Sequence, residues 1–307
     1  MSHAIRVNEW GGPEVLRYEE ASRPVPKEDE VLICVHAAGV NPLDWKIRQG
    51  NLKSMYSLPL TPGCDVSGVI EEVGGKVSGF RTGDAVYSMI GLTGGYAEYA
   101  VAKADVVAPK PARLSHVQAA AVPLAALTAW QMLIENGELK SGQRVLIHAA
   151  AGGVGSFAVQ FARHLGAYVI GTASAGNAEY LRELGARETI DYNTARFEDV
   201  ARDIDLVIDL VGGKTQDRSW SVLKPGGTLV SAVGEPSSEK AQAARVHAKR
   251  QSVRSDGKQL REIGSFVDAG HLRVEVAETF PLAQAEQAHR HGQTGHTRGK
   301  LVLTVRG

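Results

Sequence analysis

The sequence predicts an α/β fold of two domains, a β-barrel-type domain and a doubly wound parallel sheet. Short apolar runs broken by turn residues fill residues 1–120, and strand and helix patterns alternate after Arg144. A small-residue turn, Ala149–Gly155, joins an apolar run to an amphipathic segment. Closely spaced strands are typical of a β-barrel, whereas alternation indicates a parallel sheet covered by helices. The length of 307 residues is sufficient for both domains.

The N-terminal region is predicted to consist almost entirely of strands and turns. Turn signals such as Gly11-Gly12-Pro13 and Gly83-Asp84 separate its apolar runs. We expect strands over Ala4–Val7, Val15–Tyr18, Val31–Ala38, Val66–Val73, Ala85–Ser88 and Ala97–Val101.

An alanine-rich segment, Ser115–Glu135, separates the two regions and is predicted to be helical except at Pro123, with Ser115 as the N-cap. Beyond it we expect parallel strands over Val145–Ile147, Tyr168–Gly171, Glu188–Asp191, Leu206–Asp209, Thr228–Ala232 and Arg245–Val253. The expected C-terminal elements are a helix over Leu260–Ala269, a strand over Leu272–Ala277, a helix over Leu282–Arg290 and a strand over Leu301–Val305.

The turn after the first parallel strand is typical of a dinucleotide-binding βαβ unit. Its small residues allow the backbone amides at the helix start to approach a pyrophosphate, and the helix dipole favours the anion. Because Ala150 replaces the first glycine of the G-x-G-x-x-G pattern, a glycine turn in another kind of α/β sheet is the alternative. The apolar run Tyr168–Ile170 returns directly after the helix, which favours nucleotide binding.

The segments His148–Gly155 and Leu127–Trp130 resemble the zinc-independent quinone oxidoreductases of the medium-chain dehydrogenase/reductase superfamily. The A-x-x-G-x-x-G fingerprint of that family is matched by Ala149, Gly152 and Gly155. The resemblance covers nearly the whole chain. It implies a GroES-like catalytic domain over residues 1–120 and 260–307 and a Rossmann domain over residues 121–259.

The resemblance also implies an activity and an assembly. The expected activity is NADPH-dependent transfer of hydride, without zinc, to a quinone or an α,β-unsaturated carbonyl compound. The expected assembly is a homodimer joined through the edge of the nucleotide-binding sheet. The alternative function is that of an NADPH-binding redox sensor or RNA-binding protein with little catalytic activity. Oxidation of NADPH by a quinone or simple enone distinguishes the two.

The composition argues against several partners. Lys+Arg and Asp+Glu both number 34, so no net field favours nucleic acid or an anionic membrane. The N-terminus lacks an apolar core for export and no apolar run is long enough to span a membrane, so we expect a cytoplasmic protein. The only two cysteines, Cys34 and Cys64, provide neither a disulfide framework nor a four-cysteine zinc lobe.

The end of the second parallel strand carries no acid. Gly171–Asn177 lacks the Asp or Glu that binds the ribose 2′-OH in NAD-preferring folds, so we expect NADP(H). Ser174 and Asn177 would donate to the 2′-phosphate, although relatives often have a lysine in place of Asn177; the alternative is that both are only turn residues. The resemblance adds Tyr192 near the third strand and Thr128 beside the nicotinamide. The expected cofactor contacts are Thr128, Ala150, Gly152, Gly153, Val154, Gly155, Ser174, Asn177, Tyr192 and Val233.

No metal site is expected. Zinc-dependent relatives hold the metal at positions that here read Asn41, Cys64 and Leu124, and a single thiol without partners is not a zinc site. Both cysteines are therefore expected to be small buried residues. Three histidines near the C-terminus lie among polar, turn-rich residues, and we expect them to be solvated: His289, His291 and His296.

The segment Ala37–Trp45 resembles the family's A-A-G-V-N-P segment, which lies opposite the nicotinamide. The amide of Asn41 would donate a hydrogen bond to the substrate carbonyl and stabilise its developing charge; the alternative is that Asn41 only caps the turn before Pro42. Tyr56 is a candidate proton donor, with protonation by solvent as the alternative. The expected substrate pocket contains Asp44, Trp45, Leu124 and Arg250, with apolar packing as the alternative for Trp45.

The segment His247–Gln251 is unusually basic around the last parallel strand. It is consistent with a nucleic-acid patch, with a solvated edge strand, or with Lys249 or Arg250 facing the substrate. In the last case, Arg250 would select substrates that bear an anionic or strongly polar group.

Overall fold

The computed structural model describes residues 2–306, which divide into two compact units. Unit 1 contains the described residues of 1–124, 255–270 and 274–307, and unit 2 contains residues 125–254 and 271–273. The boundaries expected from the sequence lie at residues 120 and 260, and residues 271–273 fall in the unit opposite to the one expected. Neither terminal residue, Met1 or Gly307, is among the described residues.

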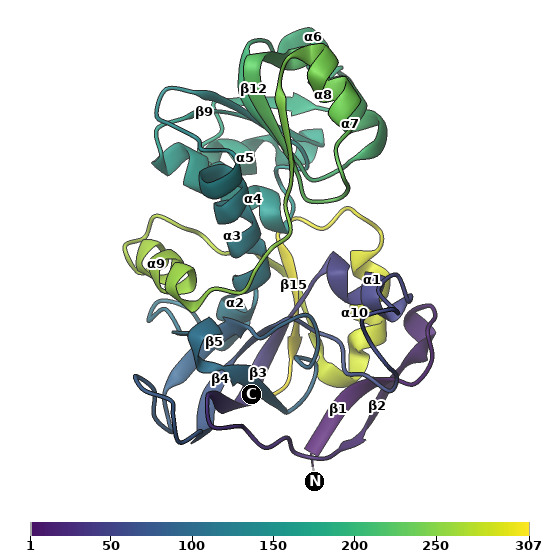
Figure 1. Cartoon of the computed structure of the whole chain (residues 1–307), viewed down its shortest axis with the longest axis vertical. Helices are drawn as coiled ribbons and strands as arrows, with labels where there is room; N and C mark the ends of the chain where they lie inside the picture. Colours follow the sequence, from purple (N-terminus) through teal and green to yellow (C-terminus); the bar gives the residue numbers. More distant parts are fainter. Residues whose placement is uncertain (1, 307) are drawn as a thin grey trace. The chain divides into compact units, whose positions relative to one another are not determined.

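Unit 1 is built on a seven-stranded sheet in the order β14-β15-β3-β4-β5-β7, with β6 paired to β3, and a separate hairpin of β1 and β2 (Figure 1). All of its strand pairs are antiparallel except β14 with β15. The strands are β1 (Ser2–Val7), β2 (Leu16–Ala21), β3 (Glu30–Val40), β4 (Asp65–Val73), β5 (Ala85–Met89), β6 (Tyr99–Lys103), β7 (Val107–Pro109), β14 (Val276–Pro281) and β15 (Lys300–Thr304).

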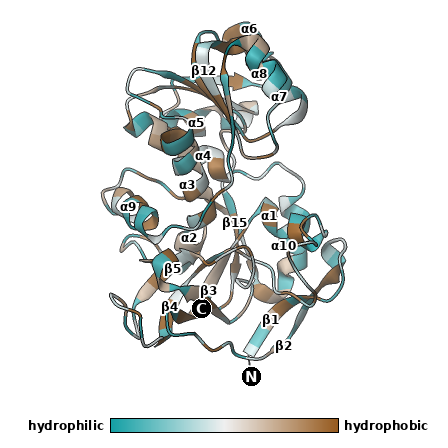
Figure 2. Cartoon of the chain, in the orientation of Figure 1, coloured by the Kyte–Doolittle hydropathy of each residue, from teal (hydrophilic) through white to brown (hydrophobic). Residues whose placement is uncertain are grey.

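Strand β3 is the centre of this unit. Its 11 residues pair with β6 through the first half and with β15 through the second half, while β4 runs along the other edge. The strand is buried along most of its length because apolar clusters cover it, which explains its nearly continuous apolar sequence. Figure 2 shows the strands of this sheet largely in brown, the colour of apolar residues.

Helix α3 (Pro123–Trp130) crosses the boundary of unit 1, and four other α-helices lie within the described part of that unit. They are α1 (Pro42–Arg48), α2 (His116–Ala120), α9 (Gly257–Asp268) and α10 (Ala285–Gly292). Helix α1 was not expected, although Pro42 at its first position is a typical start signal. The strand expected over Leu272–Ala277 is instead β14, because pairing with β15 and burial of Phe280 fix its position.

Unit 2 is a six-stranded parallel sheet in the order β10-β9-β8-β11-β12-β13. This is the 3-2-1-4-5-6 order of the Rossmann fold, so the expected doubly wound sheet is confirmed. The strands are β8 (Arg144–Ile147), β9 (Tyr168–Ala173), β10 (Glu188–Asp191), β11 (Ile204–Asp209), β12 (Leu223–Ser231) and β13 (His247–Arg250). The connecting helices are α4 (Gly153–His164), α5 (Ala178–Leu184), α6 (Phe197–Val200), α7 (Gly213–Ser219) and α8 (Ser238–Ala244).

One apolar cluster of unit 2 packs α6, α8 and Trp220 against one face of the sheet. Phe197 and Ala241 come from these helices, and Leu146 and Val207 come from the central strands. The strand order reverses between β8 and β11, so the carboxyl end of β8 lies at the topological switch point where such sheets bind ligands. Across residues 2–306, no helix has the length and apolar character needed to cross a bilayer.

Candidate cofactor and substrate sites

The turn between β8 and α4 is tight and strained. Ala149 has a φ of +49°, in the left-handed region that non-glycine residues rarely adopt. A Cβ on Gly155 would lie 2.3 Å from the Ala149 carbonyl oxygen, so only glycine fits there, whereas a Cβ on Gly152 would lie 3.3 Å from that oxygen. The glycine at position 155 therefore allows close packing of helix and strand, as in dinucleotide-binding turns.

Three backbone amides in the first turn of α4 lack a protein acceptor. Within the described chain, the N–H groups of Gly153, Val154 and Gly155 donate to no backbone or side-chain atom, and the N-cap Gly152 has no side chain to accept from them. They lie at the positive end of a 12-residue helix. Unpaired amides and a helix dipole together form an anion site, so this turn fits the pyrophosphate of a dinucleotide.

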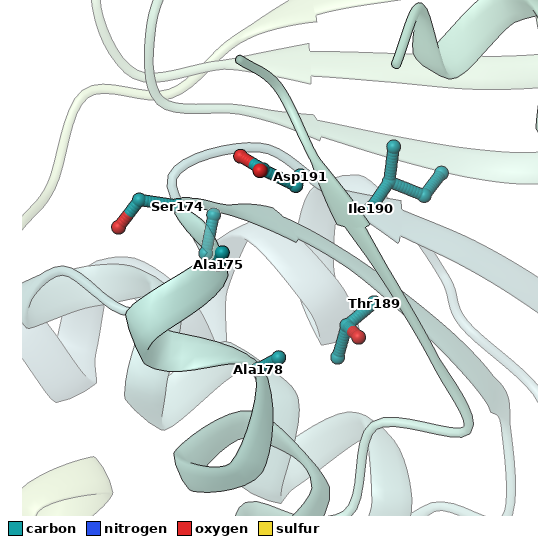
Figure 3. A pocket seen from close by; sticks show the side chains of 7 residues that line it. Ser174, Ala175, Ala178, Thr189, Ile190 and Asp191 are labelled. Atoms are coloured by element: carbon teal, nitrogen blue, oxygen red, sulfur yellow. The ribbon is translucent and has the colours of Figure 1, made fainter. Parts of the chain in front are cut away.

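A pocket of about 150 Å³ lies beside the end of β9 (Figure 3). Ser174 lines it, and the Asn177 amide donates to the Ser174 hydroxyl at 3.0 Å. Asp191, the last residue of β10, lines the same pocket because β10 pairs with β9 and Asp191 is in register with Ala173. This acid was not predicted as a pocket residue, because it reaches the pocket from β10 and not from β9.

The other expected cofactor residues fall at the ends of strands or on α3. Tyr192 follows β10 and Val233 follows β12, and these side chains are 52% and 40% exposed. Thr128 and Ala150 are buried. Because the carboxyl ends of parallel strands meet at one edge of a sheet, the turn, the pocket and the two exposed side chains share that edge.

In unit 1, Asn41 belongs to a buried polar cluster. It follows β3 directly and begins α1, and its backbone N–H donates to Asp44 Oδ2 at 2.8 Å. Its side-chain Nδ2 donates to Asp65 Oδ2 at 2.9 Å, and its Oδ1 accepts from the Lys300 ammonium. The Leu124 N–H donates to Asp65 Oδ1 at 2.9 Å. Asn41 is 1% exposed, so it is part of a satisfied network and has one amide hydrogen left.

A second part of the cluster surrounds Asp44. Its carboxylate accepts from the Tyr96 hydroxyl at 2.7 Å and from the Cys64 thiol at 3.2 Å. The Tyr96 hydroxyl lies 3.2 Å from His289 Nε2, and Arg48 Nη1 lies 2.9 Å from His289 Nδ1. His289 is fully buried, so the expectation that it is solvated was wrong; α10 turns it inward against Arg48 and Tyr96, whereas His291 and His296 are exposed.

Burial sets the protonation of these groups. It raises the pKa of Asp65 to about 7 despite the nearby Lys300 ammonium, and it raises the pKa of Asp44. Burial lowers the pKa of Lys300, and burial together with Arg48 lowers the pKa of His289 to about 3. His289 is therefore neutral at physiological pH.

Tyr56 differs from the buried cluster because it is only half-buried. Its hydroxyl donates to no acceptor among the described residues, and it packs at the border of the apolar cluster that includes Ile47 and Leu60. Burial and the neighbouring Cys64 raise the pKa of Tyr56, so it remains a protonated donor. Trp45 is half-buried and packs against α10, with its ring 5.9 Å from that of His289.

The three positions that bind zinc in zinc-dependent relatives do not fit a metal. The Cys64 thiol donates to Asp44, both ends of the Asn41 amide are hydrogen-bonded, and the Leu124 side chain has no donor atom. Among residues 2–306, no group of three or more His, Cys, Asp or Glu side chains is arranged to hold a metal.

The basic segment at β13 lies on the edge strand of the unit 2 sheet. Lys249 Nζ donates to the Asn136 carbonyl oxygen at 2.7 Å and to Glu138 at 3.3 Å. Arg250 is exposed and lies 3.8 Å from Glu235, also exposed. Lys249 therefore packs within its own unit, and Arg250 is the more exposed of the two, with side chains that are 38% and 59% exposed.

Comparison with known proteins agrees with this architecture. Residues 27–112 match the family described as "Alcohol dehydrogenase GroES-like domain", and residues 184–303 match "Zinc-binding dehydrogenase". The chain is 35% identical to the quinone oxidoreductase of Pongo abelii, over 99% of this chain and 98% of that one. It is 35% identical to the chloroplastic NADPH-dependent alkenal/one oxidoreductase of Arabidopsis thaliana, over 96% of this chain and 78% of that one.

The structure of Escherichia coli quinone oxidoreductase complexed with NADPH is similar over 99% of this chain and 100% of that one, with a TM-score of 0.91 and 31% identity. A GroES-like unit and a Rossmann unit with an open anion-binding turn define a medium-chain dehydrogenase/reductase. Within that superfamily, the chain belongs to the quinone oxidoreductase family. The resemblance and fold expected from the sequence are thus confirmed.

Proposed function

We propose that the protein is an NADPH-dependent reductase of quinones or α,β-unsaturated carbonyl compounds. The observation that carries this proposal is the turn at Ala149–Gly155, whose three unpaired amides fit a pyrophosphate. The relatives support the same conclusion, because one is named quinone oxidoreductase, one is named NADPH-dependent alkenal/one oxidoreductase, and a solved relative was complexed with NADPH. NADPH, when bound, supplies the hydride.

Residues of unit 2 would hold and orient the cofactor. The amides of α4 bind the pyrophosphate, and the Ser174 hydroxyl and Asn177 amide donate to the 2′-phosphate. Tyr192, Val233 and Thr128 complete the contacts. Ser174 and Asn177 are neutral and Asp191 is acidic, so this pocket attracts a phosphate dianion less strongly than a lysine-containing one would.

Residues of unit 1 would act on the substrate. Negative charge develops on the carbonyl oxygen of the substrate as hydride is transferred to a substrate carbon. Hydrogen-bond donors directed at that oxygen stabilise the charge. We assign this role to the Tyr56 hydroxyl and to the remaining amide hydrogen of Asn41. Tyr56 then transfers its proton to the product oxygen and regains one from solvent. Trp45 and Leu124 would form the apolar part of the pocket. Asp44 would hold Asn41 in place by accepting a hydrogen bond from its backbone N–H.

Arg250 is assigned to substrate selection. Its guanidinium is exposed and its pair with Glu235, at 3.8 Å between two exposed groups, is weak. We therefore expect it to favour substrates that bear an anionic group. Arg250→Ala should lower kcat/KM for a carboxylate-bearing enone relative to a neutral enone, and an unchanged ratio would refute this assignment.

The proposed cellular form is a cytoplasmic homodimer. The outer edge of β13 pairs with no other strand of the described chain, which leaves a sheet edge for a second subunit. Sedimentation of the purified protein tests the dimer, and a monomer at micromolar concentration would contradict it.

The activity is tested by NADPH oxidation with 9,10-phenanthrenequinone and with a simple enone. Turnover with either substrate is the expected result. The alternative, a redox sensor or RNA-binding protein, predicts tight NADPH binding without turnover. Gly152→Ala is the binding-impaired control. Its added Cβ would lie 3.3 Å from the Ala149 carbonyl oxygen and is expected to restrict the approach of the pyrophosphate to the turn.

A further inference from the structure

Three neighbouring strands bring Lys300, Asn41 and Asp65 together. Lys300 begins β15, Asn41 follows β3 and Asp65 begins β4. Leu301 is in register with Val40, so the antiparallel pairing places Lys300 beside Asn41, and Gly39 is in register with Asp65. The three side chains are 5%, 1% and 0% exposed. A buried cation, amide and carboxylate therefore meet at the point where β3 passes into α1.

The hydrogen bonds of the cluster fix the orientation of the amide. Lys300 Nζ donates to Asn41 Oδ1 and, at 2.8 Å, to the carbonyl oxygen of Val40. Asn41 Nδ2 donates to Asp65 Oδ2, which lies 4.0 Å from Lys300 Nζ. An ammonium only donates and a carboxylate only accepts, so a flipped amide would lose both bonds.

We propose that Lys300 is a positioning residue for the reaction, which holds the Asn41 amide so that its remaining N–H hydrogen is available to the substrate oxygen. This inference rests on the proposed function, because it gives Asn41 a defined orientation for the role assigned there. Two opposite charges buried in one small cluster are costly to fold. Such a cluster is explained if it fixes the geometry of a group that acts on the substrate.

The first test removes the charge and keeps the length of the side chain. Lys300→Met should lower kcat at least tenfold, because loss of one aimed donor lowers kcat by about a hundredfold or more. The Kd for NADPH should change less than twofold, since Lys300 belongs to unit 1. Lys76→Met is the matched control; Lys76 pairs with Glu28 on the surface of the same unit. A kcat for Lys300→Met within twofold of wild type would overturn the proposal.

The second test separates positioning from charge balance. Lys300→Met alone leaves Asp65 without its cation, so the melting temperature of this variant should fall. The double variant Lys300→Met/Asp65→Asn removes both charges and should recover the melting temperature. A neutral amide at position 65 both donates and accepts, so it no longer enforces one orientation of Asn41. Recovery of stability without recovery of kcat is expected, and recovery of both would show that Lys300 only balances charge.

The pH profile supplies a third readout. The titratable groups around Asp65 come from several elements. They are Lys300 on β15, Asp44 on α1, and the neighbouring Cys64 and Tyr96. Its pKa is about 7, and the Lys300 ammonium lowers it. Protonated Asp65 no longer enforces the amide orientation, so kcat should fall below about pH 7 in wild type. In Lys300→Met this fall should begin at higher pH; an unmoved profile would argue for a merely structural role.

The orientation can also be observed without turnover. In an NMR spectrum of the deuterated protein, the two Asn41 side-chain N–H signals should be distinct and protected from exchange in wild type. Loss of this protection in Lys300→Met is expected, and retained protection would overturn the inference. This result does not depend on activity. An inactive wild-type enzyme would refute the proposed function, whereas unaffected Asn41 signals would refute the role of Lys300.

Discussion

Asp191 and Ser174 line one pocket although they belong to the ends of different strands, β10 and β9. The Asp191 carboxylate accepts from the side chains of Asn193 and Thr194 at 3.1 and 3.2 Å, so it is held in place as a local anion (Figure 3 shows its position). This pocket is where the 2′-phosphate of NADPH is proposed to bind. A fixed negative charge there weakens phosphate binding and is compatible with a ribose hydroxyl.

Asp191→Asn should therefore strengthen NADPH binding. Removal of one charge near a partly solvated phosphate is worth about 1 kcal/mol, so the Kd for NADPH should fall by about threefold to tenfold. The Kd for NADH should change little. Fluorescence titration of both cofactors measures the ratio. Asp199→Asn, on the exposed part of α6, is the control; an unchanged NADPH-to-NADH ratio in Asp191→Asn would contradict this placement.

Tyr56→Phe should reduce turnover without affecting stability. The Tyr56 hydroxyl has no acceptor within residues 2–306, so its removal leaves no protein partner unpaired. Loss of a proton donor typically lowers kcat by about a hundredfold or more. Because burial raises the pKa of Tyr56 above its usual 10, activity should show no basic limb from this group up to pH 9. Stopped-flow NADPH oxidation gives kcat, with Tyr18→Phe as the control. Equal kcat values for Tyr56→Phe and wild type would show that solvent, not Tyr56, protonates the product.

Gly155→Ala and Gly152→Ala should distinguish the role of the turn in protein stability from its role in NADPH binding. The Cβ added at Gly155 would overlap the Ala149 oxygen, at 2.3 Å, and such overpacking costs about 1–3 kcal/mol of unfolding free energy. The Cβ at Gly152 meets only one atom, at 3.3 Å, and should lower the melting temperature less than the Cβ at Gly155 does. Both variants should bind NADPH more weakly. Thermal melts measure the effect on stability, and NADPH titrations measure the effect on binding. A Gly155→Ala variant as stable as wild type would argue against the close approach of Gly155 to the Ala149 carbonyl oxygen.

The sequence was sufficient to predict the α/β fold class, the Rossmann sheet and the β8–α4 turn. These depend on local patterns, namely apolar runs, alternation and the small residues at Ala149–Gly155. The resemblance located Asn41 and the turn residues. Helix α1 was missed despite a local signal, the proline after Asn41.

The partners of the candidate site residues were not predictable from local patterns. Lys300 reaches Asn41 across 259 positions of the sequence, and Asp191 reaches the Ser174 pocket only because β10 pairs with β9. His289 lies in a polar, turn-rich segment, and its burial becomes evident only when α10 packs near Arg48 and Tyr96. Strand register and helix packing, which are tertiary properties, decide these contacts.

The neutral, buried His289 should make the protein sensitive to mild acid. Its pKa is about 3 in the folded protein, whereas an unfolded histidine has a pKa of about 6.5. Above the pKa of the unfolded state, His289 is neutral in both the folded and the unfolded protein, so it does not reduce the free energy of unfolding. As the pH falls toward the folded value, only the unfolded state binds the proton, and the free energy of unfolding decreases by about 1.4 kcal/mol per pH unit.

His289→Gln should remove this contribution, because glutamine can hydrogen-bond to Arg48 and Tyr96 but does not titrate. Between about pH 7.5 and pH 5, the variant should lose about 2 kcal/mol less unfolding free energy than wild type. Asp65, whose pKa is raised to about 7, gains a proton in the folded state over this range and opposes the loss, but it does so in both proteins. Urea denaturation at the two pH values measures the difference, with the exposed His296→Gln as control. Parallel losses in wild type and His289→Gln would show that His289 is protonated in the folded protein.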